Sequence, residues 1–103
     1  SGWVQGPAIA DVPENTPTCF DADQVSVLLL NIDNQFFAYR NECSHMGMPL
    51  DGGMFDAESC ILTCPWHGFR FDITSGECMT APQAQLEPFP LRVEDGVVWV
   101  RPN

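Results

Sequence analysis

Pro and Gly interrupt this sequence every few residues and limit the length of any regular element. The 103 residues include nine Pro and eight Gly. No stretch keeps an apolar 3.6-residue period for three turns, so we expect little helix. Short β-type runs recur instead. We expect strands at Trp3–Ala10, Thr18–Phe20, Val25–Ile32, Phe36–Arg40, Ile61–Thr63, Phe69–Asp72, Gln85–Glu87, Leu91–Glu94 and Val97–Arg101.

Turn residues join several of these runs. Asp33-Asn34 and Asp95-Gly96 each separate two β-type runs, and Asp-Gly is a strong signal of a two-residue hairpin. A third turn is expected at Thr74-Ser75-Gly76. Many short strands with frequent turns predict an all-β fold, a small antiparallel sandwich or barrel. The length fits a single domain over residues 1–103.

Composition excludes several classes of function. Four Lys and Arg stand against fourteen Asp and Glu, for a formal net charge of −10, which argues against binding to nucleic acid or to an anionic membrane surface. Hydrophobic residues make up 45%, too many for a disordered acidic tail. The longest apolar stretch, Val25–Leu30, has six residues, whereas a spanning helix needs roughly 20. We therefore expect no membrane span, and the chain opens without the pattern of a signal peptide.

Two short motifs bring together the residue types that bind metals. Cys43 and His45 form a C-x-H motif, and Cys64 and His67 form a C-x-x-H motif after eighteen intervening residues. Each motif supplies one soft thiolate and one imidazole. The first lies in a long Gly- and Met-rich region, residues 41–60, which breaks the rhythm of short strands. Loops of that length in a compact domain are usually functional.

Three interpretations of these motifs are open. A structural zinc site would use all four side chains in a tetrahedron, but zinc motifs usually pair Cys with Cys and His with His. A binuclear iron centre fits the mixed motifs better, with both thiolates on one iron and both imidazoles on the other. The third interpretation is a chance proximity of Cys and His in a core.

The two motifs and their flanks resemble the Rieske iron–sulfur family. The resemblance rests on CSHMG at 43–47 and CPWHGF at 64–69, and extends to Leu50–Gly53 and Arg70–Glu77. It implies a [2Fe–2S] cluster with Cys43 and Cys64 on an inner iron and His45 and His67 on an outer iron near the surface. It also implies a cluster-binding loop subdomain at about residues 41–72.

Comparison within that family points to one kind of Rieske protein. Members that oxidise quinols carry a disulfide between the two loops, at positions that are Met48 and Trp66 here, and a Ser where this chain has Phe69. Fewer hydrogen bonds to sulfur lower the potential, so we expect about −150 mV, the low end of the Rieske range. The chain resembles soluble, cytoplasmic ferredoxins of aromatic hydrocarbon catabolism. These carry electrons from a flavin-dependent reductase to a terminal oxygenase, and we expect a monomer.

Other functions stay open at this point. An oxygenase would need a second iron site with two further His, and the two His of this chain are both assigned to the cluster. We therefore expect an electron carrier that is not catalytic on its own. The small Rieske subunit of an NAD(P)H nitrite reductase is an alternative. A zinc-bound structural module is another.

Residues around the motifs carry further hypotheses. Apolar side chains on the two loops either pack the loops together or form a docking rim for partners: Met46, Met48, Pro49, Trp66 and Phe69. Acidic residues near the loops either form a solvated face or steer a basic partner: Glu42, Asp51, Asp56 and Glu58. We expect the remaining Cys19, Cys60 and Cys78 to be small buried hydrophobes, although a Cys60–Cys78 bridge is conceivable.

Overall fold

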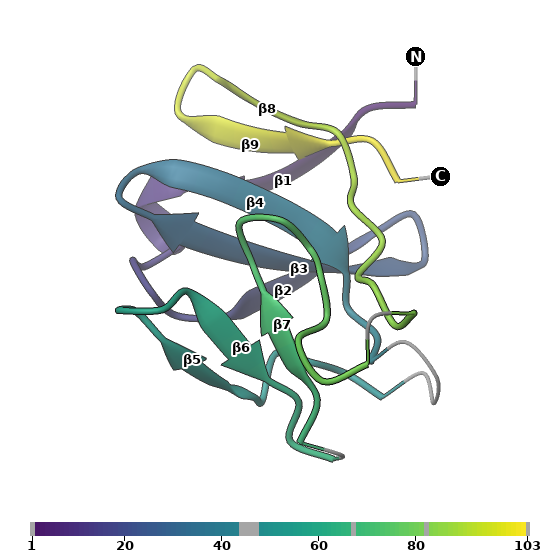
Figure 1. The fold of residues 1–103 in the computed structure, drawn as a ribbon. Helices are drawn as coiled ribbons and strands as arrows, with labels where there is room; N and C mark the ends of the chain where they lie inside the picture. The colour runs from purple at the N-terminus through teal and green to yellow at the C-terminus, as the bar shows by residue number, and fades with distance from the viewer. Residues whose placement is uncertain (1, 44–47, 67, 82, 103) are drawn as a thin grey trace.

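Three small antiparallel sheets make up the fold in the computed structural model, which describes residues 2–43, 48–66, 68–81 and 83–102. Their orders are β1-β9-β8, β2-β3-β4 and β5-β6-β7, and the sheet β2-β3-β4 lies between the other two (Figure 1). The elements are β1 Val4–Ala8, a 3-10 helix Ile9–Asp11, β2 Thr18–Ala22, β3 Val25–Ile32, β4 Gln35–Arg40, β5 Met54–Asp56, β6 Ile61–Thr63, β7 Arg70–Asp72, β8 Leu91–Glu94 and β9 Val97–Val100. The expected all-β antiparallel architecture is confirmed. No helix within the described ranges is long and apolar enough to cross a membrane.

Strand β3 is buried on both faces because it lies in the middle layer. Val27 and Leu29 belong to the upper core, the cluster of buried side chains between β3 and β9 that also contains Val98. Leu28 and Leu30 belong to a lower core that also contains residues of β6 and β7. Side chains alternate between the two faces of a strand, so one apolar run supplies both cores.

The expected turns form where the sequence predicted them. Asp33 and Asn34 both have positive φ, +53° and +65°, and Asp95 and Gly96 have +53° and +74°. These values are those of the two-residue turns that match the twist of a hairpin. The turn at 74–76 also forms, with Gly76 at φ +82°.

One expected strand is absent, and one observed strand was not expected. Gln85–Glu87 is no strand, and the chain there makes separate hydrogen bonds to two elements: Leu86 N donates to Gly76 O at 2.9 Å, and Glu87 O accepts from Arg40 N at 2.9 Å. Pro88 and Pro90 follow and have no N–H to continue a ladder. Conversely, β5 lies in the region that was expected to be a loop. Its three residues are too few to show an alternating pattern, so the sequence did not predict it.

The paired glycines before β5 offer a test of this packing. An added Cβ at Gly53 would lie 2.4 Å from the Thr63 backbone oxygen and 3.1 Å from that of Leu50, whereas a Cβ at Gly52 meets nothing within 4 Å. We expect Gly53→Ala to lower the free energy of unfolding by about 1–3 kcal/mol. Gly52→Ala should change it by no more than about 0.5 kcal/mol. Equal midpoints of denaturant unfolding for the two variants would contradict the close approach of β5 to β6.

Tyr39 gives the fold a dependence on alkaline pH. Its hydroxyl donates a hydrogen bond to the Ile73 carbonyl, which ties β4 to the turn after β7. Burial, followed by the nearby Asp72 carboxylate, raises the pKa of Tyr39 from 10.0 to about 12. Folding therefore favours the protonated phenol. The stability from this preference is complete below pH 10 and is lost as the pH rises from 10 toward 12.

The matched comparison is Tyr39→Phe, which has no group to titrate. Wild-type stability should fall relative to that of Tyr39→Phe between pH 10 and 12, measured by denaturant unfolding at each pH. Parallel pH profiles of the two proteins would show that the phenol titrates normally in the folded state.

Candidate metal centre

The first metal-binding motif begins where β4 ends. The chain leaves β4 at Arg40 and turns into the protein, so that Cys43 is only 1% exposed. The Cys43 amide donates a hydrogen bond of 2.7 Å to the Met48 carbonyl, five residues further on, and the two residues form an isolated antiparallel bridge. The base of the first loop is therefore closed directly at its cysteine.

The second motif is closed in the same way. Strand β6 leads straight into Cys64, which is 2% exposed. The Cys64 amide donates a hydrogen bond of 2.7 Å to the Phe69 carbonyl, again five residues on. Gly68, whose amide bonds to the Cys64 carbonyl at 3.2 Å, has φ +69°, a conformation that favours glycine.

The structure buries both cysteines in the lower core. Cys43 and Cys64 are members of the same cluster of buried side chains as Leu50 and Phe71. Thiolate sulfur is a soft ligand that suits iron–sulfur clusters and zinc, and two thiols kept from water at the bases of two matching loops fit such a group. His45 and His67, the other predicted ligands, lie outside the described residues.

The apolar residues of the loops divide into two groups. Met48 and Phe69 are half-buried and pack against the lower core, and the Phe69 ring meets Phe71 edge-on at a centroid distance of 6.5 Å. Trp66 is 56% exposed, and Pro49 is also exposed. The first two side chains therefore pack on the core and do not form an exposed rim, whereas Trp66 and Pro49 are exposed. Met46 lies outside the described residues.

A third segment lies beside the second loop. Met79 N donates to the Arg70 carbonyl at 2.6 Å, and Arg70 N donates to the Thr80 hydroxyl oxygen at 3.2 Å. Buried Cys78 accepts a hydrogen bond from Ala81 N through its sulfur at 3.3 Å. Sequence reasoning missed this segment, residues 78–81, because four residues after a turn are too few to show a pattern that predicts where they pack.

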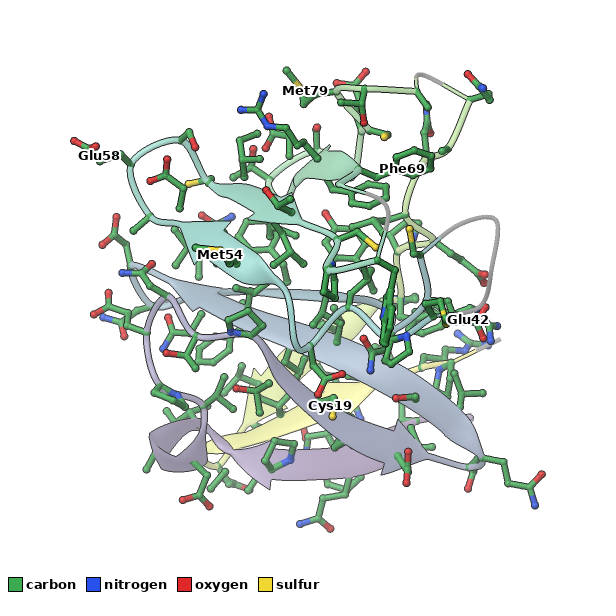
Figure 2. All side chains as sticks on the ribbon, turned by 90° about the horizontal axis from the view of Figure 1, so that it is seen from below. Cys19, Glu42, Met54, Glu58, Phe69 and Met79 are labelled. Carbon is green, nitrogen blue, oxygen red and sulfur yellow. The ribbon has the colours of Figure 1, made fainter. Side chains whose placement is uncertain are left out.

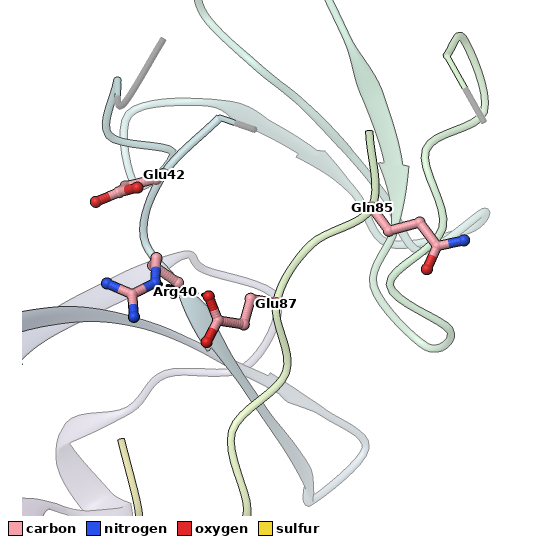
Figure 3. A pocket seen from close by; sticks show the side chains of 4 residues that line it. All are labelled: Arg40, Glu42, Gln85 and Glu87. Atoms are coloured by element: carbon pink, nitrogen blue, oxygen red, sulfur yellow. Dashed lines mark hydrogen bonds and ion pairs between the residues drawn. The ribbon is translucent and has the colours of Figure 1, made fainter. Parts of the chain in front are cut away.

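The predicted acidic residues do not form one cluster. Glu42 and Glu58 lie on opposite sides of the molecule, with Glu42 on the side of Phe69 (Figure 2). Near the first loop, Arg40, Glu42, Gln85 and Glu87 line a hollow of about 140 Å³. Arg40 lies between Glu42 and Glu87 and forms an ion pair with Glu87 at 2.9 Å (Figure 3). Near the first loop, acidic charge is therefore carried by Glu42, Asp51 and Glu87, and that of Glu87 is partly balanced by Arg40.

The three remaining cysteines differ from one another. Cys78 is buried, as expected, and Cys60 is half-buried. Cys19 is exposed, so the expectation that it is a buried hydrophobe was wrong: its thiol donates a 3.4 Å hydrogen bond to Asp51 instead of packing in the core. Desolvation and then this contact with Asp51 raise its pKa. No disulfide joins Cys60 to Cys78.

Comparison with known proteins covers nearly the whole chain. The family model for the Rieske [2Fe-2S] domain matches residues 2–90. The ferredoxin component of the alkene monooxygenase system of Xanthobacter autotrophicus is 30% identical over 98 residues, which are 95% of this chain and 80% of that protein.

Solved structures agree with this match. The ferredoxin of carbazole 1,9a-dioxygenase from Nocardioides aromaticivorans superposes with a TM-score of 0.90 at 30% identity, over the full length of both chains. A putative small subunit of an NADH-dependent nitrite reductase from Mycobacterium tuberculosis has a TM-score of 0.81 at 19% identity, over 95% of this chain and 92% of that one, which shows a shared fold alone. With two buried cysteines at the bases of matching loops and a family match over residues 2–90, this chain belongs to the Rieske [2Fe–2S] family.

Proposed function

We propose that this protein is a Rieske ferredoxin that carries single electrons from a flavin-dependent reductase to a terminal oxygenase. The observation that carries the proposal is the similarity of nearly the whole chain to ferredoxin components of oxygenase systems. A carrier of this kind has no reaction of its own. It needs a redox group near the surface and a face on which two partners dock in turn.

The redox group would be held by Cys43 and Cys64 on one iron and by His45 and His67 on the other. A Rieske cluster supplies a one-electron couple whose potential depends on its ligands and on hydrogen bonds to sulfur. The support for the two cysteines is their burial and the identical closure of their loops. The support for the two histidines is their spacing from the cysteines in the sequence. Residues 41–72 would act as the cluster-binding subdomain of a single domain.

Partners would dock on the side that carries the exposed loop residues. Trp66 and Pro49 follow the two cysteines closely in sequence and present apolar surface to solvent. Interfaces of electron-transfer proteins are small and transient, so a few exposed apolar groups suffice. We propose that this rim surrounds His45 and His67, that the protein is a monomer between encounters, and that it works in the cytoplasm, where an exposed thiol such as Cys19 stays reduced.

Two other functions make different demands. A nitrite reductase subunit would share the fold, but the similarity to such a subunit is too low to indicate function. A zinc module would use the same four side chains, and it would hold one metal ion and no sulfide. Metal and sulfide content therefore separates the zinc alternative, and partner specificity separates the nitrite reductase.

Analysis of iron and acid-labile sulfide tests the ligand assignment. We expect two irons and two sulfides per chain, and visible absorbance that bleaches on reduction. Cys43→Ala and Cys64→Ala should abolish binding. His45→Ala and His67→Ala should lower the iron content or produce an unstable cluster, whereas Cys60→Ala, which removes an unassigned cysteine, should retain full content. Stoichiometric zinc without sulfide would refute the proposal.

Salt dependence tests electrostatic steering of the partner. With a net charge of −10, reduction by a flavin-dependent reductase should slow several-fold as ionic strength rises from about 0.01 M to 1 M, because screening shortens from roughly 30 Å to 3 Å. Glu42→Lys should slow the reaction at low salt, measured by stopped-flow absorbance. The matched control is Glu58→Lys, which makes the same charge change on the opposite side of the molecule. Equal rates for both variants would exclude a steering role for Glu42.

A further inference from the structure

Asn41 is a buried polar side chain at the start of the first loop. It is only 4% exposed and precedes Cys43 by two residues. Within the described ranges, Asn31 is the other buried polar or charged residue, and it lies on β3. Burial of a carboxamide is unfavourable unless its donors and acceptor all find partners.

Every hydrogen-bonding group of the Asn41 carboxamide has a partner. Its oxygen accepts a 2.7 Å hydrogen bond from Leu50 N, at the far end of the loop. Its amide nitrogen donates to Ser26 Oγ and to Asp51 Oδ1, both at 3.1 Å. Its backbone N–H donates to the Ser26 carbonyl at 2.9 Å. The orientation of the carboxamide follows from these partners, because Leu50 N requires an acceptor.

These contacts fasten both ends of the first loop to the middle sheet. Ser26 belongs to β3, and Leu50 and Asp51 lie where the chain returns from the loop. The other carboxylate oxygen of Asp51, Oδ2, accepts the thiol of Cys19 at 3.4 Å, which adds a contact to β2. The contacts of Asn41 thus close the loop a second time, on the outer side of the hydrogen bond from Cys43 N to Met48 O.

The second loop has a different support. The bond from Cys64 N to Phe69 O matches the one in the first loop, but Cys64 follows directly from β6, whose ladder to β7 holds both ends of that loop. Cys43 is separated from the end of β4 by Asn41 and Glu42. The position of Cys43 therefore depends on side-chain hydrogen bonds, whereas the position of Cys64 depends on a β-ladder.

We propose that Asn41 is a positioning residue that sets the place of the Cys43 thiol through Leu50 and Asp51. The inference rests on the proposed function, in which Cys43 is a ligand. Asn41 touches neither cluster nor partner in this role. It keeps the two ends of the loop at a fixed separation and so slows the opening of the loop that would release iron.

Two single variants and one double variant test the hydrogen bond between residues 41 and 51. The double variant moves the carboxylate from residue 51 to residue 41. Asn41→Asp keeps an acceptor for Leu50 N but places two carboxylates side by side, and Asn41→Ala removes all three side-chain contacts. The double variant Asn41→Asp with Asp51→Asn reverses donor and acceptor. An aspartate at 41 then accepts from Leu50 N, from the Ser26 hydroxyl and from the new amide at 51.

The measurements are the rate of cluster loss from the holoprotein in excess chelator, followed by visible absorbance, and its midpoint potential. Hydrogen exchange of the peptide spanning residues 41–51 gives a readout that needs no cluster. We expect Asn41→Ala and Asn41→Asp to speed cluster loss on the order of ten-fold, because each variant disrupts the buried hydrogen bonds that hold the two ends of the loop. They should also shift the potential and expose the peptide to exchange. The double variant should return all three measurements toward wild type.

Asn31→Ala is the matched control. Asn31 is similarly buried, at 7% exposure, its amide nitrogen donates to the Val12 carbonyl, and its oxygen accepts from Asn34 N. Its loss should lower thermal stability without changing the rate of cluster loss or the potential. The proposal is overturned if Asn31→Ala speeds cluster loss as much as Asn41→Ala does, or if the double variant is no better than Asn41→Asp.

Failure of the proposed function gives a different result. Wild-type protein without iron and sulfide would refute the ligand assignment. The exchange measurement would still decide whether Asn41 holds the two ends of the loop, because faster exchange of residues 41–51 in Asn41→Ala, absent from Asn31→Ala, supports that role. Unchanged exchange would overturn it.

Discussion

The double-sided burial of β3 holds the three layers of this protein together. Leu28 and Leu30 point into the lower core, and Val27 and Leu29 point into the upper core. A domain of 103 residues has a small interior, and each of its three sheets has three strands. The lower core, which contains Cys43 and Cys64, is therefore one face of the same strand that supports the upper core.

The two cysteine loops extend this layered arrangement with different means of support. One hydrogen bond, from the cysteine amide to the carbonyl five residues on, recurs at 2.7 Å in both loops. Around it, the second loop is held by the antiparallel ladder of β6 and β7, while the first is held by Asn41 and its partners. The two loops that carry the predicted cysteine ligands are thus supported by different contacts, which lie outside the motifs.

Local patterns in the sequence predict much of this structure. The apolar run of β3 and the Asp33-Asn34 and Asp95-Gly96 turns are properties of neighbouring residues, and they form as expected. The motifs likewise identify the family, because their spacing is a local property. Strand β5, only three residues long, has no such pattern.

Other features depend on residues far apart in the chain. Asp23 and Gln24 form a further hairpin turn with positive φ at both residues. The sequence does not predict this turn strongly, since Gln is uncommon in that conformation. Cys19 is exposed, and its thiol donates a hydrogen bond to Asp51, which lies thirty-two residues away in the chain. Asn41 looks like any polar residue beside a loop until the fold brings Ser26 and Leu50 to it. Such partners are visible only after the sheets have packed.

Protein-film voltammetry of the purified holoprotein tests the central claim most directly, that this chain is a low-potential one-electron carrier. We expect a reversible one-electron wave near about −150 mV, the low end of the range for Rieske centres. The wave should persist through repeated cycles, since the protein itself is neither consumed nor changed in fold. A wave several hundred millivolts higher would contradict a role in feeding an oxygenase and would favour quinol chemistry. Absence of any wave from folded protein would contradict electron transfer altogether.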